Sequence, residues 1–211
     1  MSFHLLRLQP DPTVLAPWAT RHGVLSPDGD FGYAFHALLC AAFGDLAPKP
    51  FHYLGGRQGL LAYTSADVES LRLNAALATP DVARALGLDD LAIRPFPTAW
   101  QAGQRLGFEL RVRPVVRSKD GRERDAYLHA VSTTTNGEEG TKTGNLDARS
   151  AVYLAWLAKQ FGAGGAAEII DAQMTSFKLT RVLRKEGSGE NGKRKTTNNA
   201  GPDVVFKGEL L

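Results

Sequence analysis

The order of apolar patterns in residues 1–100 limits the possible folds more than any other feature of the chain. "SFHLLRLQ" predicts a strand, and "GDFGYAFHALLCAAFGD" (residues 29–45) predicts a helix with Asp30 as its N-cap. The segment between them, "PDPTVLAPWATRHGVLSPDGD", is expected to be a loop. Two strands joined by a Gly-rich turn follow in "KPFHYLGGRQGLLAYTS", then a helix opened by Ser65, a short helical turn, and a strand in "AIRPFPTAW". This order matches a ferredoxin-like split βαββαβ unit.

The second half repeats this order in part. "QRLGFELRVRPVV" alternates with period two and predicts a strand, while "STTTNGEEGTKTGNLD" is expected to be mobile. "ARSAVYLAWLAKQFGAGG" predicts a helix that ends at Gly162, and two long strands flank a flexible basic insert, "EGSGENGKRKTTNNAGP". We therefore expect an α+β protein of two tandem ferredoxin-like (RRM-like) domains, residues 1–100 and 101–211. We expect the second domain to lack one helix and one strand at its C-terminus, as a truncated chain would.

Cysteine and histidine usage bears on metals and cellular compartment. The one cysteine, Cys40, excludes an internal disulfide framework and a cysteine-rich zinc site. The five histidines show no paired ligand spacing, so we expect no metal and no cofactor. No run of about 18 apolar residues is present, and the N-terminus does not read as a signal peptide. These features predict a cytoplasmic protein without a membrane partner.

Charge is distributed unevenly between the two halves. Residues 1–102 carry 7 Lys or Arg against 9 Asp or Glu, and residues 103–211 carry 18 against 13. The densest stretch, "RVRPVVRSKDGRER" (residues 111–124), holds six basic and two acidic residues. A basic half beside a near-neutral half is typical of nucleic-acid binding, although a solvated basic face gives the same pattern.

The helix in residues 29–45 has two distinct faces. At 100° per residue, Phe35, Leu38 and Leu39 cluster on one side, while Tyr33, His36 and Cys40 point almost the opposite way. The Tyr–His pair fits either an interdomain contact or a chemical site, and the residues alone leave both open. Cys40 on the same face is expected to be a small packing residue.

Four stretches resemble the CRISPR-associated CasE family, the repeat-processing endoribonucleases of type I-E Cascade. "FHLLRLQPDP" is similar to that family's opening strand, and "YAFHALLCAAF" to its first helix, where Tyr and His stand three apart. "PFPTAWQAGQRLGFELRVRPVVR" resembles the interdomain segment with its following strand. "SAVYLAWLAKQFG" and "VVFKGEL" resemble the second domain's helix and strand. The family's glycine-rich C-terminal loop is not found in this sequence, and this difference supports the expectation of a truncated chain.

The resemblance implies a reaction and a set of partners. The family cleaves repeat RNA without metal, by attack of a ribose 2′-hydroxyl that leaves a 2′,3′-cyclic phosphate and a 5′-hydroxyl. His36 matches its catalytic histidine, with a general acid or base role, and Tyr33 matches a neighbouring positioning tyrosine. The implied partners are the CRISPR RNA repeat hairpin and the other Cascade subunits, with crRNA and target DNA in the assembly.

Basic residues of the second half are the candidate RNA contacts. An A-form hairpin stem is recognised by shape and backbone, which favours Lys and Arg at phosphates. The candidates are Arg111, Arg113, Arg117, Lys119, Arg122, Arg124, Arg181, Arg184 and Lys185. The aromatic residues Phe3, Phe51 and Phe108 could form RRM-type stacking platforms, but at strand spacing they are more often core.

Three hypotheses remain open from the sequence. The first is a hairpin-cleaving endoribonuclease that stays bound to its product. The second is a non-cleaving RNA-binding subunit of the same assembly, and the third is an unrelated tandem-RRM protein. The third requires a strand motif of the form K/R-G-F/Y-G/A-F-V-x-F/Y, which the sequence lacks.

Overall fold

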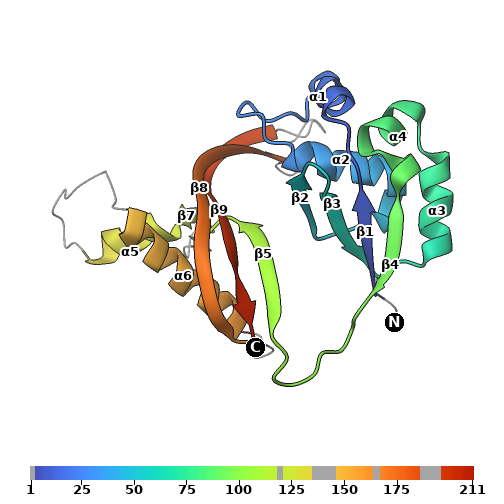
Figure 1. The fold of residues 1–211 in the computed structure, drawn as a ribbon. Helices are drawn as coiled ribbons and strands as arrows, with labels where there is room; N and C mark the ends of the chain where they lie inside the picture. The colour runs from blue at the N-terminus through green and yellow to red at the C-terminus, as the bar shows by residue number, and fades with distance from the viewer. Residues whose placement is uncertain (1–2, 118–120, 135–145, 164–166, 186–195) are drawn as a thin grey trace. The chain divides into compact units, whose positions relative to one another are not determined.

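The computed structural model describes residues 3–117, 121–134, 146–163, 167–185 and 196–211, without the side chains of 182–185 and 196–199. The chain divides into two compact units, which we describe separately. Unit 1 comprises Met1–Trp100 and Arg181–Asn199, and unit 2 comprises Gln101–Thr180 and Ala200–Leu211. Both combine helices with antiparallel strands, which confirms the predicted α+β class (Figure 1).

The sheet of unit 1 has four strands in the order β2-β3-β1-β4. They are β1 (Phe3–Leu8), β2 (Phe51–Gly55), β3 (Gly59–Thr64) and β4 (Ala92–Phe96). Every neighbouring pair is antiparallel. Strand β3 lies between β1 and β2 and pairs with both. The four strands correspond to the four that the sequence patterns predicted for residues 1–100.

Helices cover one face of this sheet (Figure 1). They are α1 (Pro12–Arg21), α2 (Gly32–Phe43), α3 (Val68–Leu77) and α4 (Pro80–Leu86), with short 3₁₀ turns η1 (Gly44–Leu46) and η2 (Leu88–Asp90). The register places Leu6 opposite Ala62 and Leu8 opposite Leu60, so these side chains share a face. All four are fully buried in a core with side chains from the four helices.

Helix α1 lies inside the segment predicted to be a loop, so that prediction is wrong. The Asp11 carboxylate accepts a hydrogen bond from the Thr13 N–H at 2.8 Å, and Pro12 takes the first helical position, where a missing N–H costs nothing. Leu15 and Trp18 are buried in the unit 1 core. The Asp–Pro start signal and the burial of one face favour a helix here, even with Pro17 inside it.

Two predicted helix caps are displaced. Helix α2 has Phe31 rather than Asp30 at its N-cap, although the Asp30 carboxylate still accepts a hydrogen bond from the Gly32 N–H at 2.8 Å. Helix α3 is capped by Asp67, which accepts from the Ser70 N–H at 2.8 Å, and not by Ser65. In each case the chain uses an acidic side chain close to the helix start.

Unit 2 contains a three-stranded sheet in the order β5-β9-β8 and a separate β6-β7 ribbon. The elements are β5 (Leu106–Val112), β6 (Val115–Arg117), β7 (Glu123–Asp125), α5 (Ala126–Thr134), α6 (Leu146–Gly162), β8 (Ile169–Lys185) and β9 (Thr196–Leu210). The predicted alternation of β5 is confirmed, because Leu106, Phe108 and Leu110 are half-buried and the residues between them are exposed. Tyr153 and Leu157 of α6 pack with Val204 and Phe206 of β9.

Regular structure extends into two segments predicted to be mobile or flexible. Strand β9 begins at Thr196, inside the predicted insert, and α5 continues to Thr134. The remainder of the two segments, residues 135–145 and 186–195, lies outside the described residues. No helix in the described part of the chain is long and apolar enough to cross a membrane.

A buried ion pair organises the interior of unit 2. Arg149 of α6 donates to Asp125 at 3.0 Å, and the side chains are only 12% and 8% exposed. The Tyr153 hydroxyl lies 2.8 Å from Asp125, and burial raises the pKa of this phenol above its ordinary value, so it stays protonated as a donor. The guanidinium carbon of Arg149 also lies 4.3 Å from the centroid of the Tyr127 ring and 4.8 Å from that of Phe177.

Replacing Asp125 by alanine should therefore destabilise the protein strongly. Loss of one partner leaves the Arg149 charge buried and unpaired, and the free energy of unfolding should fall by about 3–5 kcal/mol in urea titrations. Glu209→Ala is the control, because its pair with Arg105 is 69% and 52% exposed and should contribute about 0–1 kcal/mol. Equal effects of the two substitutions would contradict the role given to Asp125.

Candidate functional site

Helix α2 presents Tyr33 and His36 away from the core. Phe35, Leu38 and Leu39 are at most 1% exposed, whereas His36 is exposed and Tyr33 is half-buried. The Tyr33 and His36 ring centroids are 6.3 Å apart, with the ring planes at 40°. The two faces of this helix are thus arranged as its sequence predicted.

Cys40 lies one turn beyond His36 on the same face. Its sulfur is 3.8 Å from Nε2 and 3.9 Å from Nδ1 of His36, and the cysteine is exposed. An exposed imidazole can donate or accept a proton near neutral pH, and a phenol can hydrogen-bond the same ligand from one turn earlier. This face can therefore bring a proton-transfer group and a positioning group to a single bound molecule.

The turn that leads into α2 holds the backbone of Arg181. Ser26 and Gly29 close the turn through a hydrogen bond from the Gly29 N–H to the Ser26 carbonyl at 2.9 Å. The Ser26 hydroxyl donates to the Arg181 carbonyl, and the Asp28 carboxylate accepts from the Arg181 N–H, both at 2.5 Å. Arg181, a candidate RNA contact, is thereby fixed beside the segment that enters α2, with its own side chain exposed.

Two other candidate arginines are bound inside unit 2. Arg111 of β5 forms a two-pronged ion pair with Asp203 of β9, whose side chain is 8% exposed. Arg113 donates to the Thr180 carbonyl at 2.9 Å and the Pro202 carbonyl at 3.2 Å. These bonds connect β5 and the residue that follows it to β9 and β8, the other two strands of the sheet.

The β6-β7 ribbon carries three other candidate contacts. Arg117 lies 3.3 Å from Glu123 and is 73% exposed, and Arg122 and Arg124 are also exposed. Lys119 lies outside the described residues, and the side chains of Arg184 and Lys185 in β8 are not described. The ribbon is thus the part of unit 2 where predicted basic contacts face solvent.

Two histidines outside α2, His4 and His22, lie at hydrogen-bonding distance from backbone carbonyl oxygens. His4 is buried, with Nδ1 3.1 Å from the Ala66 carbonyl oxygen. His22 stacks on Trp18 at 4.2 Å between centroids, and its Nδ1 lies 2.8 Å from the Trp18 carbonyl oxygen. Among the described residues, no group of three or more His, Cys, Asp or Glu is arranged to hold a metal ion.

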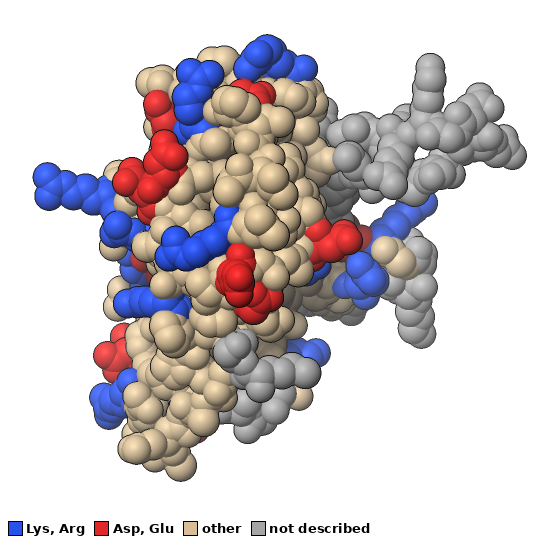
Figure 2. Space-filling view, turned by 90° about the vertical axis from the view of Figure 1, so that its right-hand side faces the viewer, with Lys and Arg blue, Asp and Glu red and all other residues tan. Residues whose placement is uncertain are grey.

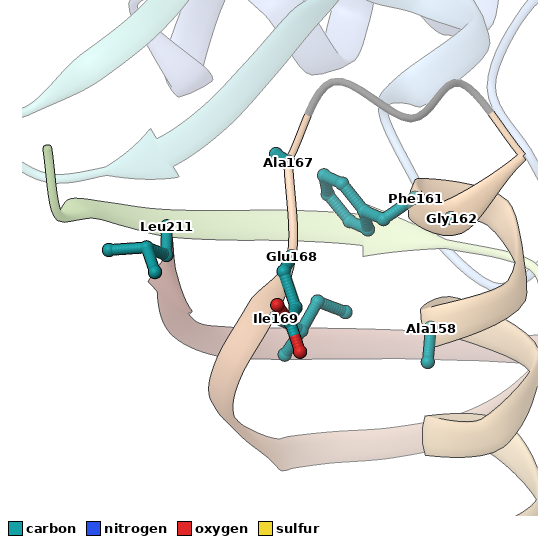
Figure 3. A pocket seen from close by; sticks show the side chains of 7 residues that line it. All are labelled: Ala158, Phe161, Gly162, Ala167, Glu168, Ile169 and Leu211. Atoms are coloured by element: carbon teal, nitrogen blue, oxygen red, sulfur yellow. The ribbon is translucent and has the colours of Figure 1, made fainter. Parts of the chain in front are cut away.

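A cavity of about 520 Å³ lies at one end of unit 2 (Figure 3). Its walls come from the end of α6, the start of β8 and the last residue of the chain: Ala158, Phe161, Gly162, Ala167, Glu168, Ile169 and Leu211. Among the described lining residues, Glu168 is the one with a titratable side chain, and none is a predicted site residue. The cavity is therefore separate from the predicted chemistry.

The comparisons with known proteins identify the family. The sequence model of the family described as "CRISPR associated protein" matches residues 3–211, and the chain belongs to this family. Membership contradicts the hypothesis of an unrelated tandem-RRM protein. A search of curated proteins finds no match.

Solved structures show a related fold at low sequence identity. The chain is similar to a structure of the CRISPR endoribonuclease Cse3 bound to a 19-nucleotide RNA, with 19% identity and a TM-score of 0.53. It is also similar to Thermus thermophilus Cse3 bound to an RNA representing a pre-cleavage complex, with 18% identity and a TM-score of 0.55. Each alignment covers 100% of this chain and 85% of the other. This chain therefore has a Cse3-like fold.

Replacing Asp28 by alanine should expose the Arg181 amide to solvent exchange. A hydrogen bond to a charged acceptor contributes about 1.5–3 kcal/mol, so the Arg181 N–H should exchange about 10- to 150-fold faster. Hydrogen–deuterium exchange measures this, with Asp45→Ala in η1 as the control. An unchanged Arg181 amide in Asp28→Ala would show that the turn does not hold the strand in solution.

Proposed function

We propose that this protein is a metal-independent endoribonuclease that cleaves CRISPR precursor RNA at repeat hairpins. It then stays bound to the 3′ hairpin of the crRNA as a subunit of the Cascade complex. The observation that carries the proposal is the outward-facing Tyr33–His36 pair on α2, in a CRISPR associated protein with a Cse3-like fold.

We also propose that the chain consists of two tandem ferredoxin-like domains, residues 1–100 and 101–211. In unit 1 the first three strands lie in the order β1-β3-β2, and the long strands of unit 2 lie in the equivalent order β5-β9-β8. The same relative placement of first, third and second strands supports two copies of one topology. The division into units between Trp100 and Gln101 supports the boundary, with Arg181–Asn199 as the exception.

The proposed chemistry requires two proton transfers. The ribose 2′-oxygen loses its proton and bonds to phosphorus, while the bond from phosphorus to the 5′-oxygen breaks and that oxygen gains a proton. The products are a 2′,3′-cyclic phosphate and a 5′-hydroxyl. His36 supplies the acid or base, and Tyr33 orients the phosphodiester through its hydroxyl. In the alternative function, a non-cleaving subunit, the same face contacts RNA without chemistry.

Phosphate contacts in the proposed complex come from exposed arginines. Arg117, Arg122 and Arg124 on the β6-β7 ribbon are exposed to solvent, and Arg181 lies beside the turn that enters α2. A hairpin stem displays its phosphates and a shallow minor groove, which suits such side chains. Lys119, Arg184 and Lys185 belong to the proposal on sequence grounds alone.

Substituting His36 separates the two functions. With repeat RNA in excess EDTA, the wild-type protein should cleave, and His36→Ala should cleave about 10²- to 10⁴-fold more slowly while binding the hairpin normally. His129→Ala, an exposed histidine on α5, should cleave at the wild-type rate. Cleavage that stops in EDTA, or that is undiminished in His36→Ala, would refute the mechanism.

Salt dependence tests the ribbon. Replacing Arg117, Arg122 and Arg124 by glutamine should flatten the plot of log affinity against log salt, by about 0.9 for each duplex phosphate that the protein no longer neutralises. The matched control replaces three exposed arginines of unit 1, Arg57, Arg72 and Arg84, and should leave the slope for hairpin RNA unchanged. Equal slopes for the two triple variants would show that the β6-β7 ribbon does not contact the RNA phosphates.

A further inference from the structure

The sheet of unit 1 has a second face, turned away from its helices. Strand residues alternate, so Leu6 and Leu8 enter the core while Phe3, Leu5 and Arg7 point the other way. The register extends this surface across the sheet, because Leu5 lies opposite both Tyr63 and Arg94, and Phe3 lies opposite Phe96. We call it the open face and define it by Phe3, Arg7, Leu61, Tyr63, Arg94 and Phe96.

Aromatic rings from three strands meet on the open face. Phe3 is stacked with Tyr63 at 6.0 Å between centroids and 10° between planes. Phe96 meets Tyr63 edge-on at 5.0 Å, and Trp100 extends the group with its ring 5.9 Å from Phe96. The three strand rings are half-buried and Trp100 is 46% exposed, while Leu5 on the same face is 5% exposed. The rings thus form a platform with solvent-accessible surface.

The charge on the open face has one sign. Arg7 and Arg94 are exposed, and neither side chain has a hydrogen-bond or ion-pair partner in the described part of the chain. The residues that the register places on this face include no Asp or Glu among those described. By contrast, basic and acidic side chains are interspersed on the side of the molecule where α3 lies (Figure 2).

We propose that the open face binds an unpaired stretch of RNA. Each base has a π face that stacks on an aromatic side chain at about 1–3 kcal/mol per base, and the phosphates between bases pair with guanidinium groups. Arginines beside aromatic rings supply both kinds of contact. A protein partner that only covered the rings would leave two guanidinium groups desolvated and unpaired, which is costly.

The proposal does not depend on cleavage by His36. Helix α2 packs against the other face of the same sheet, through Leu38 and Leu39 in the core with Leu6. The open face is therefore a separate surface from the Tyr33–His36 pair. It would take single-stranded RNA adjoining a hairpin, whereas the proposed active site acts on the hairpin itself.

A 12-nucleotide oligouridylate, which forms no hairpin, tests the open face in the full-length His36→Ala protein. It should bind and quench tryptophan fluorescence, and the quenching should disappear in Trp100→Phe. Tyr63→Leu with Phe96→Leu keeps the apolar character but removes two rings, and should weaken binding at least tenfold. Arg7→Gln with Arg94→Gln should reduce the salt slope by about 1.4, while Arg72→Gln with Arg84→Gln should leave it unchanged.

The Arg7→Gln, Arg94→Gln variant should fold normally, because neither side chain is buried. A loss of binding in this variant is therefore not explained by misfolding. Oligouridylate that does not quench Trp100, or that binds both open-face double variants as it binds the parent protein, overturns the proposal. With His36 restored, these variants should cleave a hairpin without single-stranded flanks at the wild-type rate. Absence of hairpin cleavage in every protein would refute the proposed function. Oligouridylate binding would still test whether the open face binds unpaired RNA.

Discussion

The packing of α2 against the sheet of unit 1 determines where the functional groups of that unit point. Phe35, Leu38 and Leu39 are removed from water almost completely, which fixes the rotation of the helix about its axis. With that rotation fixed, Tyr33 and His36 face away from the core. A polar pair on this helix is thus held in place by apolar residues on its opposite side.

Partners distant in sequence decide what a basic residue does in unit 2. Arg111 and Arg117 are six positions apart in the same predominantly basic stretch, yet Arg111 pairs with a buried carboxylate and Arg117 is largely in solvent. The difference arises because β5 is paired with β9, which brings Asp203 beside Arg111. The β6-β7 ribbon is not part of this three-stranded sheet, and its three arginines remain exposed.

Local pattern predicted the elements of this fold well, since periodicity depends only on nearby residues. The strands of unit 1, the alternation of β5 and the two faces of α2 all follow from spacing. Helix α1 was missed although Asp11 followed by Pro12 is a helix start signal. The hydrogen bonds of Arg111 and Arg113 could not be predicted in this way, because their partners lie 67 to 92 residues further along the chain.

The open face could not be predicted from local sequence pattern either. Phe3, Tyr63 and Phe96 belong to three strands and form no motif in sequence, and they meet only because β1 lies between β3 and β4. Of the three aromatics considered from sequence, Phe3 joins this platform, whereas Phe51 and Phe108 pack against the cores of their units. Because strand side chains alternate, a residue of the platform and its neighbour in the core are adjacent in sequence but separated by the sheet. Substitutions on the open face can therefore change an RNA contact without moving α2, and two sites of different chemistry can share one sheet.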